Sequence, residues 1–189
     1  TKGYIGTGSD GGYTKDFWEY DPNDASLGMD VNCNPLGKWT MKADFGGVGR
    51  YGAVGFGIGT KGYIGTGSDG GYKNDFWEYD SGTDIWVQKA DFGGTPRNLA
   101  VGFSIGMMGY IGTGDDGGGS KKDFWEYKTS INSWVQRPDF GGSARFSAVG
   151  FNIGANGYIG TGNDGGYPID FWEYAPCVNA TNTLVQAAC

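Results

Sequence analysis

The chain has 189 residues, of which 39 are glycine and 16% are aromatic, and its formal net charge is −7. Glycine destabilises helix interiors, whereas turn formers and aromatic residues favour pleated strands, so the composition predicts an all-β protein. An acidic surface repels nucleic acid and anionic membranes, and no apolar run is long enough for a membrane span. The sequence has no histidine, which excludes Ser-His-Asp catalysis and histidine-based metal centres.

One phrase of ten residues, GYIGTGSDGG, organises the chain. It stands at 3–12 and again at 62–71, and variants follow at 109–118 and 157–166. The starts are separated by 59, 47 and 48 residues, and a period in the high forties is typical of one four-stranded propeller blade. The first interval is longer because segment 21–38 carries twelve additional residues, rich in Asn, Asp, Pro and Gly, which we expect to form an exposed loop.

Four strands are predicted in each unit, here called a to d. In the second unit they cover 51–59, 61–67, 75–80 and 85–92, and Gly, Asn or Asp separates them. The four units are expected at 1–49, 50–96, 97–144 and 145–189. Strands b, c and d are predicted four times but strand a only three times, because the first unit lacks it. We therefore expect a segment of a larger ring, and the alternative is a small closed ring with one defective blade.

The repeated residues resemble the kelch repeat over essentially the whole chain. The repeat sequence is similar to that of secreted or surface kelch proteins of Bacteroidetes-type bacteria. The matching positions are Tyr20, Tyr79, Tyr127 and Tyr174, then Trp39, Trp86 and Trp134, then Arg50, Arg97 and Arg145. Strand b ends Gly-Thr-Gly rather than Gly-Gly, and Leu184 stands where the fourth tryptophan is expected. The resemblance implies a β-propeller with four repeats, and it leaves function open because propellers host many functions.

The loops between strands b and c hold the candidate ligand-binding residues. They are expected on one face together with the d–a connections, which is a common partner-binding face of kelch propellers. Asp10, Asp69, Asp116 and Asp164 head these loops, and the interpretations are a repeated calcium or ligand site or simple turn chemistry. Tyr13, Tyr72 and Tyr167 follow the glycines, with Gly119 in the third loop, and they would stack on a sugar, anchor a peptide or pack between blades.

Strand c carries two carboxylates per unit. Asp16, Asp75, Asp123 and Asp170 begin it, and Glu19, Glu78, Glu126 and Glu173 lie inside it. A glycosidase pair is one interpretation, but identical pairs in every unit favour blade architecture. Arg50, Arg97 and Arg145 are predicted to bind carboxylates or carbonyls structurally, with a sialidase-type arginine cluster as the alternative. Trp18, Trp77, Trp125 and Trp172 are predicted to pack between blades as large buried side chains.

Cys33, Cys177 and Cys189 fit neither a zinc cluster nor a complete disulfide set, and no metal or cofactor is expected. In a ring of more than four blades Cys33 and Cys177 stay apart, so no disulfide is predicted between them. The chain begins at Thr1, and we interpret it as a processed or excised product.

The leading hypothesis is a non-catalytic, extracellular or cell-surface propeller that acts in adhesion, as a scaffold or in protein interaction. The alternative is a carbohydrate-binding propeller that uses the tyrosine-bearing loops. An enzyme resembling the copper oxidase of kelch fold is disfavoured, because that site needs histidine ligands. The expected partner is a protein or glycan at the b–c and d–a face, together with further blades from flanking sequence or another chain.

Overall fold

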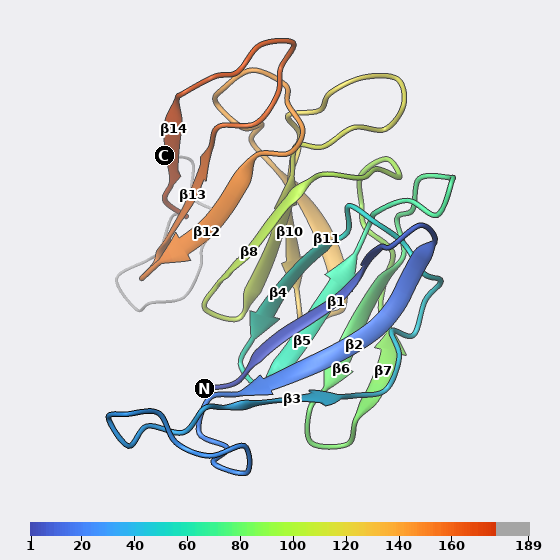
Figure 1. Ribbon diagram of the computed structural model, residues 1–189. Coiled ribbons are helices and arrows are strands. Elements are labelled where there is room, and N and C mark those ends of the chain that lie inside the picture. Colours follow the sequence, from blue (N-terminus) through green and yellow to red (C-terminus); the bar gives the residue numbers. More distant parts are fainter. Residues whose placement is uncertain (177–189) are drawn as a thin grey trace.

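The computed structural model describes residues 1–176, and within that range every regular element is a strand. The strands form four antiparallel sheets, each a meander in chain order (Figure 1). The first sheet holds β1 (Gly3–Ser9), β2 (Tyr13–Asp21) and β3 (Lys38–Met41). The second holds β4 (Val54–Ile58), β5 (Lys61–Gly65), β6 (Phe76–Asp80) and β7 (Ile85–Gln88). The third holds β8 (Val101–Ile105), β9 (Met108–Gly112), β10 (Phe124–Lys128) and β11 (Ser133–Arg137). The fourth holds β12 (Val149–Ile153), β13 (Asn156–Gly160) and β14 (Phe171–Tyr174).

The predicted all-β fold of four blades is confirmed, and each sheet is called a blade below. Blades 2 and 3 have all four strands, and blade 1 lacks strand a, as the repeat count indicates. Strand d of the fourth unit was expected in 177–189 and lies outside the described residues. The inner strands β4, β8 and β12 pack side by side in that order. Within residues 1–176 no strand of blade 4 packs against blade 1, which is the arrangement of a partial ring.

Strand b is shorter than the sequence predicts in blades 2 to 4. It ends before the Thr-Gly pair, because Thr66 and Gly67 adopt positive φ angles of 59° and 95° and turn the chain away. Blade 1 differs, since β1 continues past a bulge between Gly6 and Gly8 and pairs Ser9 with Tyr13. Strand d is also shorter, and β7 stops at Gln88.

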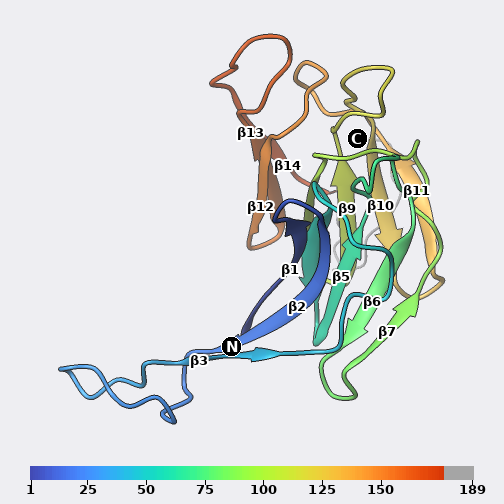
Figure 2. The same ribbon diagram turned by 45° about the vertical axis from the view of Figure 1, so that its right-hand side comes forward.

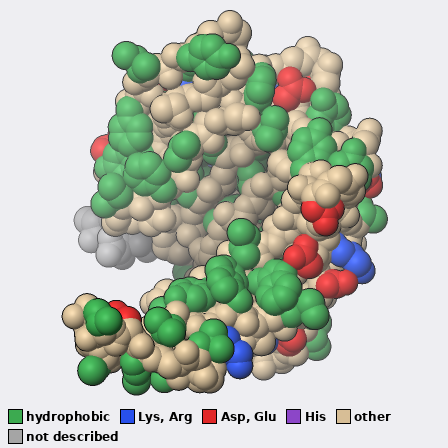
Figure 3. Space-filling model, viewed as in Figure 1, with side chains coloured by type: hydrophobic (Ala, Val, Ile, Leu, Met, Phe, Trp, Pro, Cys, Tyr) green, Lys and Arg blue, Asp and Glu red, His purple; other side chains and the backbone are tan. Residues whose placement is uncertain are grey.

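The core lies between adjacent blades rather than within one sheet. Phe76 from one face of blade 2 meets Tyr127 of blade 3 edge-on, with ring centroids 4.9 Å apart, and Phe17 meets Tyr79 in the same way at 4.8 Å. Within residues 1–176 each end blade has a neighbouring blade on one side only. Their hydrophobic side chains are therefore exposed over blade 4 and over β1–β3, as Figure 3 shows, and they include Trp39, Met41, Phe151, Phe171 and Trp172.

The tryptophans of strand c lie against the preceding blade where there is one, but they are less buried than the sequence predicts. Phe76 and Tyr79 are buried, whereas Trp77 is half-buried and Trp172 is exposed. The indole of Trp77 does reach the preceding blade, where a Cβ added to Gly46 would lie 2.7 Å from it. In a propeller both faces of a blade are covered, so the alternation of Phe and Tyr places each against a different neighbour, and the indole lies nearer the loops.

The long segment between β2 and β3 is exposed and has little regular structure, as predicted. Its turns are closed by aspartates, such as Asp30, whose Oδ1 accepts hydrogen bonds from the backbone amides of Asn32 and Asn34 at 2.8 and 2.9 Å. Cys33 is exposed within it. Cys177 and Cys189 lie outside the described residues, so the expected absence of a 33–177 disulfide stays a prediction. Residues 1–176 include no helix that is both long and apolar enough for a membrane crossing.

Candidate binding surface

The loops between strands b and c lie beside the d–a connections at one end of the blades (Figure 2). Tyr51 pairs with Ser68 by two backbone hydrogen bonds of 2.9 and 3.0 Å, and Lys73 pairs with Arg97 of the next blade. The surface made by the b–c loops 9–15, 68–74, 115–122 and 163–169 and the d–a connections 42–50, 89–97 and 138–145 is called the loop face. The backbone pairing confirms the prediction that the b–c loops and the d–a connections share one face.

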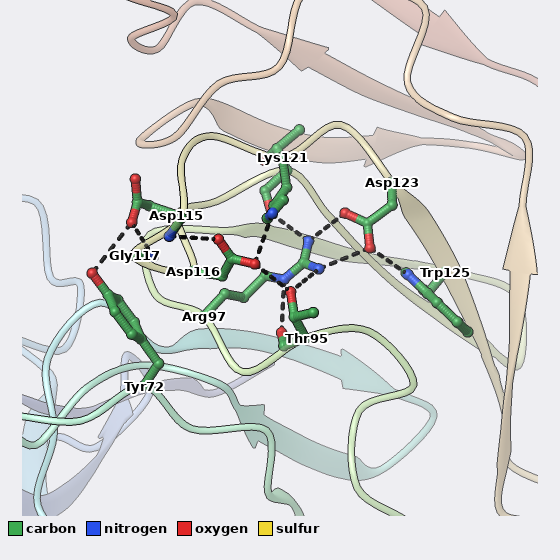
Figure 4. A network of polar contacts seen from close by, with 11 residues as sticks. Tyr72, Thr95, Arg97, Asp115, Asp116, Gly117, Lys121, Asp123 and Trp125 are labelled. Carbon is green, nitrogen blue, oxygen red and sulfur yellow. Dashed lines mark hydrogen bonds and ion pairs between the residues drawn. The ribbon is translucent and has the colours of Figure 1, made fainter.

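A buried arginine anchors the loop face in each of blades 2 to 4. Arg97 is fully buried, and its Nη1 and Nη2 donate to the two carboxylate oxygens of Asp123 at 2.5 and 2.8 Å (Figure 4). Nη1 also donates to the carbonyl of Thr113 at 2.9 Å, and Nε donates to the carbonyl of Thr95 at 3.0 Å. The guanidinium lies 5.0 Å from the centre of the Phe92 ring. Every donor direction is used, so this arginine ties strand a to strands b and c and to the d–a connection.

The same arrangement recurs around Arg50 and Arg145, which bind Asp75 and Asp170 through both carboxylate oxygens. Burial opposes ionisation of Asp75, but the Arg50 guanidinium and the Trp77 indole hold its pKa below the usual value. Hydrogen bonds from Arg145 and then from the Trp172 indole lower the pKa of Asp170 to about 2. The three arginines lie in three separate blades, each with its own carboxylate, and they do not converge on one centre.

Asp16 is the exception among the aspartates that begin strand c. Its Oδ2 accepts a hydrogen bond from the Trp18 indole at 2.7 Å, as in the other blades. Among the described residues no arginine reaches it, because strand a, which would carry the arginine, is missing from blade 1.

The aspartates that head the b–c loops close the turns. In all four loops Oδ1 accepts a hydrogen bond from the amide two residues later, at 3.0 to 3.2 Å, and these aspartates are Asp10, Asp69, Asp116 and Asp164. Three have a second partner: Asp69 pairs with Lys73 at 2.9 Å, Asp116 with Lys121 at 2.7 Å, and Asp164 accepts from Ser143 Oγ at 2.6 Å. Those partners come first among the causes that lower the pKa of each carboxyl. The carboxylates point along the loops and are engaged there.

The loop tyrosines reach toward the following blade. The Tyr13 ring stacks on Tyr51 of blade 2 with centroids 5.8 Å apart, and Tyr72 donates from its hydroxyl to Asp115 Oδ1 of blade 3 at 3.2 Å (Figure 4). Both rings stay partly exposed. Tyr167 is 88% exposed, since it belongs to the last blade described. The structure therefore places Tyr13 and Tyr72 both at a blade junction and at the surface, and it brings Tyr167 to none of the other candidate residues.

The glutamates of strand c pair with tyrosines of strand b rather than with the aspartates. Each tyrosine hydroxyl donates to the glutamate directly opposite it, and the pairs are Tyr4–Glu19, Tyr63–Glu78, Tyr110–Glu126 and Tyr158–Glu173. In blade 3 the buried Glu126 also binds Arg137 through both oxygens, at 2.8 and 3.1 Å. Burial first, and the negative glutamate next to the hydroxyl, raise the pKa of Tyr110. All four glutamates have the same tyrosine partner, so this pairing does not distinguish one glutamate as a catalytic acid and another as a base.

Sequence reasoning missed two kinds of residue on the loop face. It did not identify which carboxylate each arginine binds, although the spacing of 25 or 26 residues from arginine to aspartate recurs in blades 2 to 4. It also missed Thr95 and Ser143, whose hydroxyls donate to the loop aspartates Asp116 and Asp164. The signal was the repeated small hydroxyl residue two positions before the arginine, which Val48 replaces in the first copy.

Within the described part of the chain, no three Asp, Glu, Cys or His side chains gather as metal ligands would. Three of the b–c loops present one turn-closing aspartate, and the third loop presents two, Asp115 and Asp116, whereas calcium takes six to eight oxygen ligands.

Comparison with known proteins shows a fold and no family. No model of a known family matches the chain, and no curated protein matches it. The solved structure of YjhT is similar, with a TM-score of 0.69 over 93% of this chain at 17% sequence identity. The chain spans 62% of the length of that structure. The likeness and the four antiparallel sheets together define a fold of the β-propeller type.

Proposed function

We propose that this chain is part of a kelch-type propeller that binds a protein partner at its loop face and acts outside the cell in adhesion or as a scaffold. The observation that carries the proposal is the contrast between side chains on that face. The carboxylates are held by turns, lysines or arginines, whereas the rings of Tyr13, Tyr72 and Tyr167 keep exposed surface. Tyrosine provides a large amphipathic contact at a low cost in side-chain entropy.

The stiffness of the loop face supports a binding role. In blades 2 to 4 each b–c loop is closed by an aspartate, paired with the residue after the buried arginine and fixed by that arginine, so little conformational entropy is lost when a partner docks. A rigid platform with exposed aromatic side chains is typical of protein-binding surfaces.

A non-catalytic role is part of the proposal. An acid–base pair requires two groups whose environments move their pKa values apart. The aspartates at the arginines and at the loop turns have their pKa values moved downward together, among them Asp75, Asp123, Asp164 and Asp170. This pattern supports a repeated structural use of the carboxylates.

Site-specific photo-crosslinking tests the proposal. A photoreactive phenylalanine analogue replaces Tyr167 on the loop face or, as the matched control, Ile131 in the c–d turn, which is also exposed. The chain is added to intact cells of the source organism. We expect one crosslinked protein from position 167 and none from 131, and we expect Tyr72→Ala to weaken capture. Equal labelling from both positions, or capture only after lysis, would contradict the loop face or the extracellular location.

The second candidate function is glycan binding by the same tyrosines, because exposed aromatic rings stack on sugars. An array of immobilised oligosaccharides separates the two candidates. Saturable glycan binding that is lost in Tyr13→Ala and Tyr72→Ala would favour the glycan, and crosslinking to protein without glycan binding would favour the protein partner.

A further inference from the structure

The inner edge of blade 1 is an unfilled strand position, and we propose that it binds one extended segment of the sequence Arg-x-x-Ala-Val-Gly-Phe-x-Ile-Gly, supplied by a polypeptide other than blades 2 to 4. The inference does not rest on the proposed function, because this edge is separate from the loop face. Three features of the structure carry it: a free strand edge, a carboxylate without its arginine and a cavity of the right shape.

The first feature is the free edge of β1. In blade 2 the inner strand β4 pairs antiparallel with β5, placing Val54 opposite Gly65, Phe56 opposite Tyr63 and Ile58 opposite Lys61. Residues 1–13 of blade 1 are identical to residues 60–72 of blade 2, so β1 offers the same edge. Within the described residues β1 pairs with β2 on one side and with no strand on the other. An exposed strand edge presents unpaired backbone donors and acceptors and is a template for an added strand.

The loss of the inner strand leaves β1 open to solvent. Tyr4 is 41% exposed, against 3% for Tyr63. In the other blades a phenylalanine of strand a stacks on this tyrosine, with centroids 5.9 Å apart for Phe56 and Tyr63. The sequence of β1 is therefore that of a strand which pairs with an inner strand, and the described residues do not supply that inner strand.

The second feature is the carboxylate of Asp16. Its counterparts Asp75, Asp123 and Asp170 each bind the arginine that stands four residues before the valine of strand a. Asp16 is half-buried and oriented by the Trp18 indole, so the acceptor for such an arginine is already in place. Charge complementarity therefore specifies an arginine at that position of the incoming segment.

The third feature is a cavity of about 770 Å³ between blades 1 and 2, lined in part by Tyr4, Ile5, Gly55, Gly62 and Ile64. The matching space between blades 2 and 3 is filled by Phe56, because a Cβ added to Gly109 would lie 2.5 Å from that ring. Gly62 is the counterpart of Gly109, and a Cβ there would meet only Tyr79, at 3.7 Å. Blade 2 therefore has the glycine, Gly62, that leaves space for a phenylalanine ring, and no protein atoms fill that space.

The occupant is specified by three copies in the chain itself. Strand a has the sequence Val-Gly-Phe-x-Ile-Gly in β4, β8 and β12, with an alanine before it and an arginine four residues before the valine. All three copies are used within their own blades. Residues 177–189 contain neither arginine nor phenylalanine, so they do not offer this chemistry.

Strand complementation with a synthetic peptide tests the proposal. The peptide has the sequence of residues 95–106, Thr-Pro-Arg-Asn-Leu-Ala-Val-Gly-Phe-Ser-Ile-Gly, with a fluorophore at its N-terminus. Anisotropy is measured against the 189-residue chain, and we expect saturable binding with one peptide per chain. The same peptide with Arg97→Gln should bind at least about tenfold more weakly, a loss of about 1.4 kcal/mol.

Three variants of the chain sharpen the test. Asp16→Asn removes the carboxylate, and Gly62→Ala fills the space reserved for the phenylalanine, so each should weaken peptide binding at least about tenfold while the free chain stays folded. Asp139→Asn changes the charge equally at an exposed position away from the cavity and should leave binding unchanged.

The proposal is overturned if the peptide does not bind, or if Asp16→Asn and Gly62→Ala bind it as the unchanged chain does. Sedimentation velocity of the chain alone supplies an independent outcome. A dimer that Asp16→Asn dissociates would identify a second copy as the occupant and would contradict a separate strand.

Discussion

Asp123→Asn is the sharpest test of how the blades are held together. Arg97 is fully buried, and Asp123 balances its charge through two hydrogen bonds of 2.5 and 2.8 Å. Asparagine keeps the shape and one acceptor oxygen, but it removes the charge and turns an amide donor toward the guanidinium donors.

The expected loss follows from the burial of the pair. Removing one partner of a buried ion pair costs about 3–5 kcal/mol, because the other charge stays buried without compensation. The carbonyls of Thr95 and Thr113 still accept from Arg97, and Asp123 retains some contact with solvent, so we expect about 3 kcal/mol of lost unfolding free energy.

The chain contains its own control. Asp16 occupies the same position in blade 1, but among the described residues it accepts no hydrogen bond from an arginine and accepts only from the Trp18 indole. Asp16→Asn should therefore cost less than about 1 kcal/mol, the usual range for one hydrogen bond.

Urea unfolding followed by tryptophan fluorescence measures both variants. With a slope of about 2 kcal/mol per molar urea, the midpoint of Asp123→Asn should fall by about 1.5 M and that of Asp16→Asn by less than about 0.5 M. Equal shifts in the two variants, or a shift below about 0.5 M for Asp123→Asn, would refute the view that the arginine pairs stabilise the blades.

Three further outcomes are expected. The pKa of Asp170 is lowered to about 2 from an unfolded value near 3.9, so its contribution to stability is present above about pH 4 and is lost as the pH falls toward 2. Urea midpoints should fall over this pH range, and Asp170→Asn should make that fall smaller. Gly93→Ala should cost about 1–3 kcal/mol, because its Cβ would lie 2.7 Å from the Trp125 indole, whereas Gly71→Ala, whose Cβ would meet only Asp69 Oδ1 at 3.9 Å, should change the melting temperature little. Replacing 22–37 by the four-residue turn of blade 2 should shift the midpoint by less than about 0.5 M urea, and a larger loss would count against the alignment of the blades.

The sequence alone determined the architecture. The repeat intervals, the alternation of large and polar residues in Asp-Phe-Trp-Glu-Tyr and the glycine turns predicted four blades, the long loop after Tyr20 and the missing inner strand of the first blade, and the structure confirms them. These features depend on local pattern, because strand pairing in a meander joins neighbours in the chain.

Only the tertiary structure decided which side chains meet. The contacts between blades join residues more than forty positions apart: the Ala43 amide donates to Asp84 and the Trp86 indole donates to the Ala43 carbonyl. The sequence shows that Phe, Trp and Tyr all recur, but not that Phe76 and Tyr79 are buried while Trp77 is only half-buried, since that depends on how one blade is rotated against the next. The missing inner strand of blade 1 leaves Asp16 without an arginine and leaves the cavity beside β1, and these lost contacts are visible only where the neighbours of that strand are in place.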